Sequence, residues 1–295
     1  MLQSKNKFHD QEIHPSNVRE MLSKLGWPIR AGALRIIRYI YKKRPEPILI
    51  HLLQIPFDLL TVLIGPDPQM KFVIFCQGRT GSTLLESLLA SHPMIDRAWE
   101  LLDKRKRKWN LFLYVNARAR LSEKKIWGLK VKLFQLSNEQ KVDPRKFLAR
   151  LHERGWKIIY LKRRNILRQA VSHFVRVHRG KLHKKDNTPE HIFFRIEFKD
   201  LMKRIEEQKT YLAKEEEILR ELPHITLVYE DDLLRKEVHQ RTLDRLFMFF
   251  GVPIAPVRTD MLKITPENMS KVIENFDELA QILRKTEYRM YLEEE

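Results

Sequence analysis

The stretch "FVIFCQGRTGSTLLESLLA", residues 72–90, joins a short apolar segment to a leucine-rich segment through a loop that contains two glycines. The apolar part predicts a buried strand, and the leucine-rich part predicts a helix. Backbone N–H groups at the start of a helix lack partners inside it, and the helix dipole is positive there. An anion in this loop would gain hydrogen bonds and favourable electrostatics together, so the stretch predicts an anion-binding site.

The loop differs from the loop that binds nucleoside triphosphates. That loop has the pattern G-x-x-x-x-G-K-[ST], with a lysine for the phosphates and a hydroxyl for magnesium. Here Ser82 follows Gly81 directly, and Cys76 stands at the position of the first glycine. The cation is Arg79 instead, which predicts a phosphate compound held without a metal ion. The residues that we expect to hold the anion are those of the loop and the first helical turn: Gly78, Arg79, Thr80, Gly81, Ser82 and Thr83.

The composition indicates the size of the core and the kind of molecule that the protein binds. The chain has 295 residues and a hydrophobic fraction of 43%, which is enough for one sizeable core or at most two small domains. Its 56 Lys and Arg residues against 38 Asp and Glu give a net charge of +18, which predicts an anionic partner. A nucleic acid, an anionic membrane and a phosphorylated or sulfated small molecule all fit. The single cysteine, Cys76, excludes an intramolecular disulfide and favours a reducing compartment.

The first 70 residues predict a helical N-terminal extension to a domain over residues 71–295. The basic segment 35–44 precedes an apolar run, residues 47–65, that His51, Gln54, Pro56 and Asp58 interrupt. Three interpretations stay open for the region 35–65: a helix packed on the protein, a helix on a membrane surface, or a spanning anchor. No secretory signal is visible in the first 25 residues. We expect a cytoplasmic protein, with or without a peripheral membrane contact; a membrane-anchored luminal protein is the alternative.

From residue 71 onward, short β-rich runs alternate with helical stretches. This alternation predicts an α/β fold, in which helices flank a central parallel sheet. We expect strands at residues 71–76, 125–134, 156–163 and 224–230. We expect helices near residues 82–92, 145–154, 165–179, 190–221, 236–251 and 273–285.

A second candidate anion site lies in "KIIYLKRRNILRQAVSHF", residues 157–174. A buried strand ends there in a run of cations, and Asn165 opens a helix. Arg164 and Ser172 are eight residues apart, so the arginine at the strand end and the serine two helical turns later can point the same way. A guanidinium with a hydroxyl suits a second phosphate.

These segments together resemble the sulfotransferases that use 3′-phosphoadenosine 5′-phosphosulfate (PAPS), in particular the carbohydrate-type and bacterial members. "GRTGSTLL" at 78–85 is similar to their 5′-phosphosulfate loop, and "YLKRRNILRQAVSHF" at 160–174 is similar to their 3′-phosphate motif. "LVYEDDL" at 227–233 and "LDRLFMFFGVP" at 243–253 resemble later family segments, so the resemblance covers about residues 71–285. It implies a fold related to P-loop proteins, Arg164 and Ser172 at the 3′-phosphate, and Tyr229 near the adenine.

The resemblance also implies candidates for catalysis. Arg79 would stabilise the phosphate that the reaction leaves. Phenol and steroid sulfotransferases have a histidine shortly after a lysine at a strand end; here Lys130 matches the lysine, but Lys132 replaces the histidine. Lys130 would then reach the bridging or sulfuryl oxygens. The segment "SHPMIDRAWELL", residues 91–102, resembles the one that supplies a glutamate base in carbohydrate-type members, which makes Glu100 the candidate base.

The resulting prediction is a metal-independent, in-line transfer of the sulfuryl group from PAPS to a hydroxyl of a glycan, glycolipid or other alcohol. The partners are then the donor and the acceptor, with no specific nucleic acid. A P-loop nucleotide kinase and a catalytically inactive nucleotide-binding relative are alternatives. A nucleic-acid binder would explain the charge but would leave the Arg79 loop unexplained. The basic loops near residues 100–125 and 176–200 favour an anionic or membrane-presented acceptor, and the oligomeric state stays open.

Overall fold

The computed structural model describes residues 27–43, 47–98, 101–102, 108–182, 193–261 and 268–293. The chain forms two compact units. Unit 1 consists of Met1–Asp67 and Lys108–Ser122, and unit 2 consists of Pro68–Arg107 and Glu123–Glu295. Unit 1 is therefore more than an N-terminal extension, because it includes a segment that the sequence places between two strands of unit 2.

Unit 1 is built from three helices, α2 (Trp27–Lys43), α3 (Pro47–Ile64) and α5 (Leu111–Arg120). Leu34 and Ile37 of α2 are buried against the end of α3, three residues apart on one helical face. Asp58 of α3 is buried and accepts a hydrogen bond of 2.5 Å from Arg118 of α5. These contacts agree with the packed-helix interpretation of residues 47–65. Among the described helices, none combines the length and apolar character that crossing a lipid bilayer requires.

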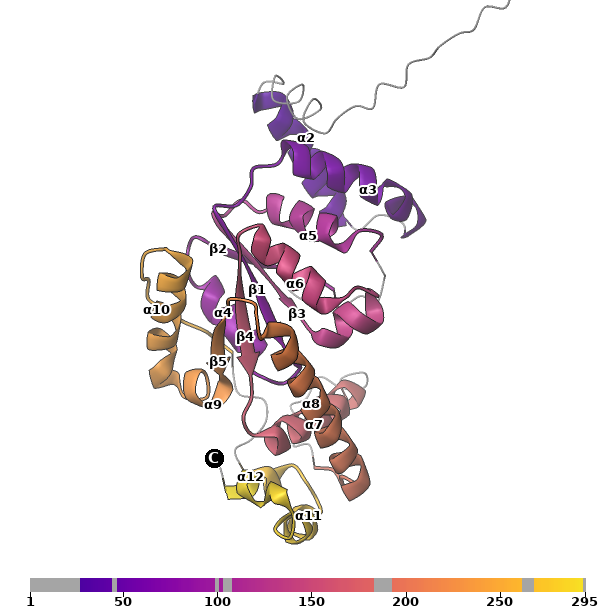
Figure 1. Ribbon diagram of the computed structural model, residues 1–295, viewed down its shortest axis with the longest axis vertical. Coiled ribbons are helices and arrows are strands. Elements are labelled where there is room, and N and C mark those ends of the chain that lie inside the picture. The colour runs from indigo at the N-terminus through magenta and orange to yellow at the C-terminus, as the bar shows by residue number, and fades with distance from the viewer. Residues whose placement is uncertain are drawn as a thin grey trace, which may run out of the picture. The chain divides into compact units, whose positions relative to one another are not determined.

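Unit 2 contains a five-stranded, all-parallel sheet with the strand order β2-β3-β1-β4-β5 (Figure 1). This confirms the predicted α/β class and the central parallel sheet. The strands are β1 (Met70–Cys76), β2 (Ile95–Ala98), β3 (Ile126–Val131), β4 (Trp156–Lys162) and β5 (Ile225–Val228). The sequence analysis missed β2, a four-residue edge strand whose middle residues are Asp96 and Arg97. Charged residues suit an edge strand but remove the apolar signal that would predict it.

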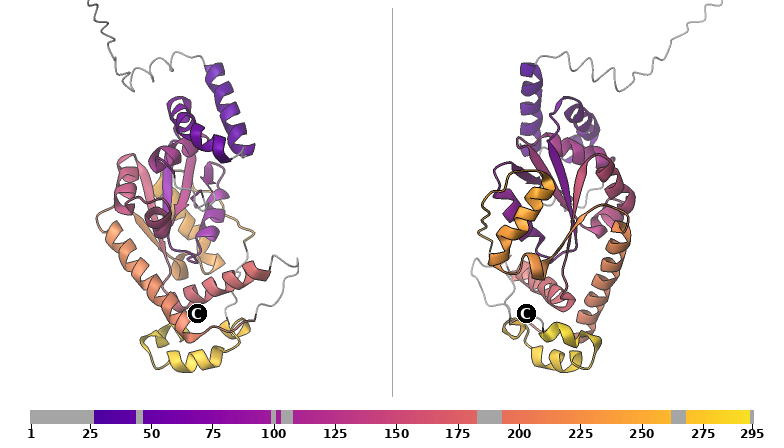
Figure 2. Two further views of the ribbon diagram at one scale, coloured as in Figure 1. Left: turned by 90° about the vertical axis from the view of Figure 1, so that its right-hand side faces the viewer. Right: turned by 60° about the vertical axis from the view of Figure 1, so that its left-hand side comes forward.

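Helices cover both faces of this sheet (Figures 1 and 2). On one face, α4 (Ser82–Ala90) and α10 (His239–Phe250) pack their apolar residues against Phe72 and Ile74 of β1. The rings of Phe72 and Phe250 stack there with 4.9 Å between their centroids. The other face carries α6 (Pro144–Glu153) and α8 (Phe198–Leu219).

A second apolar cluster joins α7 (Ile166–Leu182) and α8 to α11 (Phe276–Leu283), near the carboxyl ends of the strands. Unit 2 also contains the short α-helices α9 (Tyr229–Asp232) and α12 (Met290–Glu293). The predicted helix at 190–221 begins only at Phe198, because Phe194 forms a bridge to Ile273 instead. The predicted strand at 125–134 ends at Val131, before a π-helical turn at Gln135–Glu139.

Candidate anion-binding site

The loop between β1 and α4 is held in a left-handed turn. Arg79 has φ 68° and Gly81 has φ 84°, and Gly81 directly precedes the first residue of α4. A Cβ atom on Gly81 would lie 2.5 Å from the ring of Tyr229, so both the backbone conformation and the close approach of that ring require glycine. Gly78 has no such requirement, because a Cβ atom there would meet nothing within 4 Å. Thr80 is buried, and its hydroxyl donates to the Gln77 carbonyl at 3.0 Å.

The structure brings the two candidate anion segments of the sequence together. Arg79 Nε donates a hydrogen bond of 2.9 Å to the hydroxyl of Ser172 on α7, although 93 residues separate them. Arg163 Nη1 donates to the Arg79 carbonyl at 3.3 Å, from the end of β4. The side-chain amide of Gln169, on α7, donates to the Gly78 carbonyl at 2.9 Å. The loop is therefore fixed by residues that follow the neighbouring strand β4.

A cavity of about 250 Å³ opens between these elements. Of the residues expected at the anion, it is lined by Arg79, Gly81, Ser82, Thr83, Ser172 and Tyr229. Three arginines, Arg79, Arg163 and Arg168, and one lysine, Lys236, line it, and its described lining contains no acidic residue. Burial and the nearby charges of Arg176 and Arg163 lower the pKa of Arg79. An anion in the cavity would relieve this repulsion and complete the hydrogen bonding of the guanidinium groups.

Arg163 and Arg168 are two arginines of the lining that were not predicted from the sequence. Arg168 lies one helical turn before Ser172 on α7, a signal that the helical period could have supplied. Arg163 could not be distinguished from Arg164 by sequence, because both follow the strand directly. In the structure Arg164 is half exposed and pairs with Asp231, beside a different hollow of the surface.

Tyr229 connects the end of β5 to this cavity. Its ring lies 4.7 Å from the Arg163 guanidinium, a cation–π contact, and burial raises the pKa of its hydroxyl. The next residue, Glu230, pairs with Arg163 Nε at 3.4 Å and accepts a hydrogen bond of 2.9 Å from the backbone N–H of Arg164. The "YED" segment thus orients the arginine that follows β4.

The remaining two candidates are Lys130 and Glu100. Lys130 is only 3% exposed, and its ammonium group donates to Glu86 Oε2 at 2.8 Å. It therefore ties β3 to α4 beneath the loop, and it is not among the residues that line the cavity. Glu100 lies outside the described residues.

A layer of buried polar side chains lies directly beneath the loop. The Gln77 amide donates to the Gln208 carbonyl at 3.2 Å and to Glu215 Oε2 at 3.4 Å, both on α8. The Tyr160 hydroxyl also donates to Glu215, at 3.4 Å. Glu215 is 1% exposed, and this burial raises its pKa to about 8, so the carboxyl group is neutral at pH 7.

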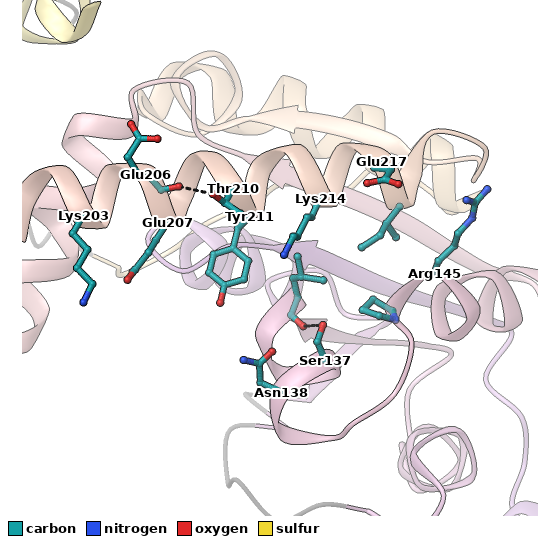
Figure 3. Close-up of a pocket in the computed structure, with 13 residues that line it drawn as sticks. Ser137, Asn138, Arg145, Lys203, Glu206, Glu207, Thr210, Tyr211, Lys214 and Glu217 are labelled. Carbon is teal, nitrogen blue, oxygen red and sulfur yellow. Dashed lines mark hydrogen bonds between the residues drawn. The ribbon is translucent and has the colours of Figure 1, made fainter. Parts of the chain in front are cut away.

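A second, larger hollow of about 830 Å³ runs along α8. Tyr211 and Lys214 project from one side of this helix toward Ser137 and Asn138, which follow β3, and Lys203 and Glu207 project from the same side farther along the helix (Figure 3). We call this hollow the α8 groove. Unlike the cavity it contains both signs of charge, and Glu207 pairs with Arg204 at 3.2 Å.

Comparisons with known proteins find similarity in three-dimensional structure alone. No family model matches the chain, and no curated protein sequence matches it. A crystal structure of a sulfotransferase from Alicyclobacillus acidocaldarius is similar over 75% of this chain and 95% of its own, with 15% identity and a TM-score of 0.43. The mouse sulfotransferase SULT7A1 complexed with PAP is similar over 78% and 90%, with 12% identity and a TM-score of 0.39. Such low values do not carry an activity or a ligand from those proteins to this chain.

Proposed function

We propose that this protein is a sulfotransferase that transfers the sulfuryl group of PAPS to a hydroxyl acceptor. The observation that carries the proposal is the hydrogen bond between Arg79 and Ser172. It joins the two sequence segments that resemble the phosphosulfate loop and the 3′-phosphate motif in one cavity. Cations line that cavity without an acidic residue in its described lining, as a ligand with several negative charges requires.

The cationic and hydroxyl side chains of the two segments have separate roles in this proposal. The 5′-phosphosulfate lies against the start of α4, where free N–H groups, Ser82 and Thr83 meet Arg79. Ser172 and Arg168 receive the 3′-phosphate, and Arg164 is a further ligand if it exchanges Asp231 for the phosphate.

The chemistry explains why cations are needed at the loop. The acceptor oxygen attacks sulfur in line, and the bond between sulfur and the 5′-phosphate oxygen breaks. Negative charge then develops on the departing phosphate, where Arg79 and the backbone N–H groups stabilise it without rearrangement. The acceptor proton passes to a base, for which Glu100 is our candidate from the sequence resemblance.

The α8 groove is our proposed route for the acceptor. The cavity lies on the β4 and β5 side of the loop, since Arg163 and Tyr229 follow those strands. The groove lies on the β3 side, since Ser137 and Asn138 follow β3, the other neighbour of β1. Gln77, one residue before the loop glycine, donates to the carbonyl of the buried Gln208 on α8, the helix whose other residues line the groove. Donor and acceptor would thus approach the loop from opposite sides.

Calorimetric titration with 3′-phosphoadenosine 5′-phosphate, in the absence of metal, tests the donor assignment. We expect micromolar or tighter binding by the wild-type protein and a loss of about 100-fold in Arg79→Ala, because a charged hydrogen-bonding partner is removed. Arg241→Ala is the matched control, since Arg241 is an exposed arginine of α10.

Three other outcomes would contradict the proposal or indicate a different function. Absence of binding by the folded wild-type protein contradicts the proposal. Binding of ATP only with magnesium indicates a nucleotide kinase. Binding of the nucleotide, without sulfate transfer from labelled PAPS to any of a panel of glycans, glycolipids and simple alcohols, indicates a catalytically inactive relative.

A further inference from the structure

Helix α2 of unit 1 has two apolar faces. Leu34 and Ile37 are buried within unit 1, at 3% and 2% exposure. Ile29 and Ile36 are 61% exposed, and Tyr39 is 57% exposed. These three residues are seven and three positions apart, so they lie along one side of the helix over about 15 Å. Unit 1 therefore presents an apolar stripe, Ile29, Ile36 and Tyr39, that its own core does not use.

All the charged residues of α2 are cationic. Its 17 residues include five Lys or Arg and no Asp or Glu. Arg35 is exposed and precedes Ile36 directly in the sequence. Arg38 donates from Nε to the Leu121 carbonyl at 3.1 Å, which helps to hold α2 on unit 1. An apolar stripe on a purely cationic helix matches the headgroup region of an anionic bilayer, where both features find partners.

The stripe is part of a wider asymmetry between the units. Among the described residues, six of the twelve exposed large apolar side chains belong to unit 1, although it is much the smaller unit. These six are Ile29, Ile36, Tyr39, Ile55, Leu59 and Trp109. Tyr and Trp are the side chains that favour the boundary between lipid and water.

We propose that α2 docks unit 1 on the surface of an anionic lipid bilayer, with its axis in the membrane plane. Ile29, Ile36 and Tyr39 enter the boundary between headgroups and acyl chains, and the exposed Arg35 contacts the anionic headgroups. A nucleic acid would use the charge but not the apolar stripe. A second copy of this chain, which has a net charge of +18, would use the stripe but would bring like charge to a helix without a single acidic residue. This inference is independent of the sulfotransferase proposal.

Flotation of the full-length protein with lipid vesicles tests the inference. The vesicles are either pure phosphatidylcholine or contain about one third phosphatidylserine, a content that gives a strongly negative surface. We expect binding to the anionic vesicles, weakened by salt, and little binding to the neutral ones. Ile29→Ser with Ile36→Ser should reduce binding about tenfold or more, because both side chains contribute buried apolar area in the bound state. Arg35→Gln should reduce it about fivefold.

The matched control is Met248→Ser with Ile254→Ser, two side chains of unit 2 that are 64% and 58% exposed. It should bind vesicles as the wild-type protein does, and thermal unfolding should show that all variants are folded. Equal binding by the α2 variant and the wild-type protein overturns the proposal, as does absence of wild-type binding. Self-association that the α2 variant abolishes, without vesicle binding, would assign the stripe to a second copy of the chain and also overturns it.

Discussion

Lys130 and Arg79 are two cations of the same α/β unit, and they differ in the groups that surround them. Lys130 lies in β3, 3% exposed, and the carboxylate of Glu86 balances it at 2.8 Å. Arg79 lies in the loop after β1 and donates to the neutral hydroxyl of Ser172, with Arg163 and Arg176 near enough to lower its pKa. The first cation is compensated within the fold. The second is compensated by no carboxylate within the described part of the chain.

The difference separates a structural charge from a binding charge. A buried charge needs a partner, because the interior solvates it poorly. Where the fold supplies the partner, removing one member destabilises the protein. Where the fold supplies only like charges and neutral groups, as at Arg79, we propose that the partner is an external anion, so that removing the cation affects binding. Each prediction below tests this distinction, from the largest expected effect to the smallest.

Lys130→Met should destabilise the protein by about 3–5 kcal/mol, because it removes the cation that donates a hydrogen bond to the buried carboxylate of Glu86. Lys130→Met combined with Glu86→Leu should recover most of that loss, since neither charge remains. Urea unfolding of the two variants and the wild-type protein measures both effects. A single variant as stable as the wild-type protein would show that Lys130 is not a structural charge.

Glu215 is a third buried ionisable group, and its raised pKa favours the protonated, neutral carboxyl group. Its folded pKa of about 8 lies above that of an unfolded glutamate, so the folded state binds the proton more tightly. Its stabilising contribution is complete at low pH and declines as the pH rises toward 8, by about 1.4 kcal/mol per pH unit. Glu215→Gln cannot ionise, so its stability relative to the wild-type protein should rise between about pH 5 and pH 8. Urea unfolding across this range measures the difference; parallel curves would contradict the neutral carboxyl group.

Arg79→Ala should leave the unfolding free energy within about 1 kcal/mol of the wild-type value, because the lost hydrogen bond is offset by relief from like charges. The same variant should bind 3′-phosphoadenosine 5′-phosphate about 100-fold more weakly, a loss of about 2.7 kcal/mol. Thermal unfolding and calorimetry on one preparation separate the two effects. A strongly destabilised variant would place Arg79 with Lys130 among the structural charges.

The structure and the sequence resemblance assign the nucleotide to different arginines: the structure favours Arg163, and the resemblance favours Arg164. Arg163→Ala should weaken nucleotide binding about tenfold, because its guanidinium lines the cavity beside Tyr229. Arg164→Ala should weaken it by about threefold or less, because its partner in the structure is the exposed Asp231. Calorimetry decides between them, and the reverse order would mean that Arg164 turns to the nucleotide on binding.

The sequence by itself determined the local features, which depend on residues close to one another along the chain. Apolar runs alternating with helical stretches predict the parallel sheet. A strand, a glycine loop and a leucine-rich helix predict the anion site at residues 78–83. Asn165 predicts the start of α7, where its side chain accepts a hydrogen bond of 2.8 Å from the Arg168 N–H. Each of these signals is local and regular, and the sequence displays such signals directly.

Only the tertiary structure decided which of several like residues lines the cavity and which lies away from it. Arg163 and Arg164 are adjacent and chemically identical, and their roles depend on Tyr229, Glu230 and Asp231, more than 60 residues away. Lys130 resembles a catalytic lysine in sequence, yet its partner 44 residues earlier makes it structural. Glu215 is an ordinary glutamate on a charged helix until burial raises its pKa, although the hydrogen bonds from Gln77 and Tyr160 oppose that rise. The physical reason is the same in each case. The burial and the neighbouring groups of an ionisable side chain decide its pairing and its pKa, and segments distant in the sequence supply those neighbours.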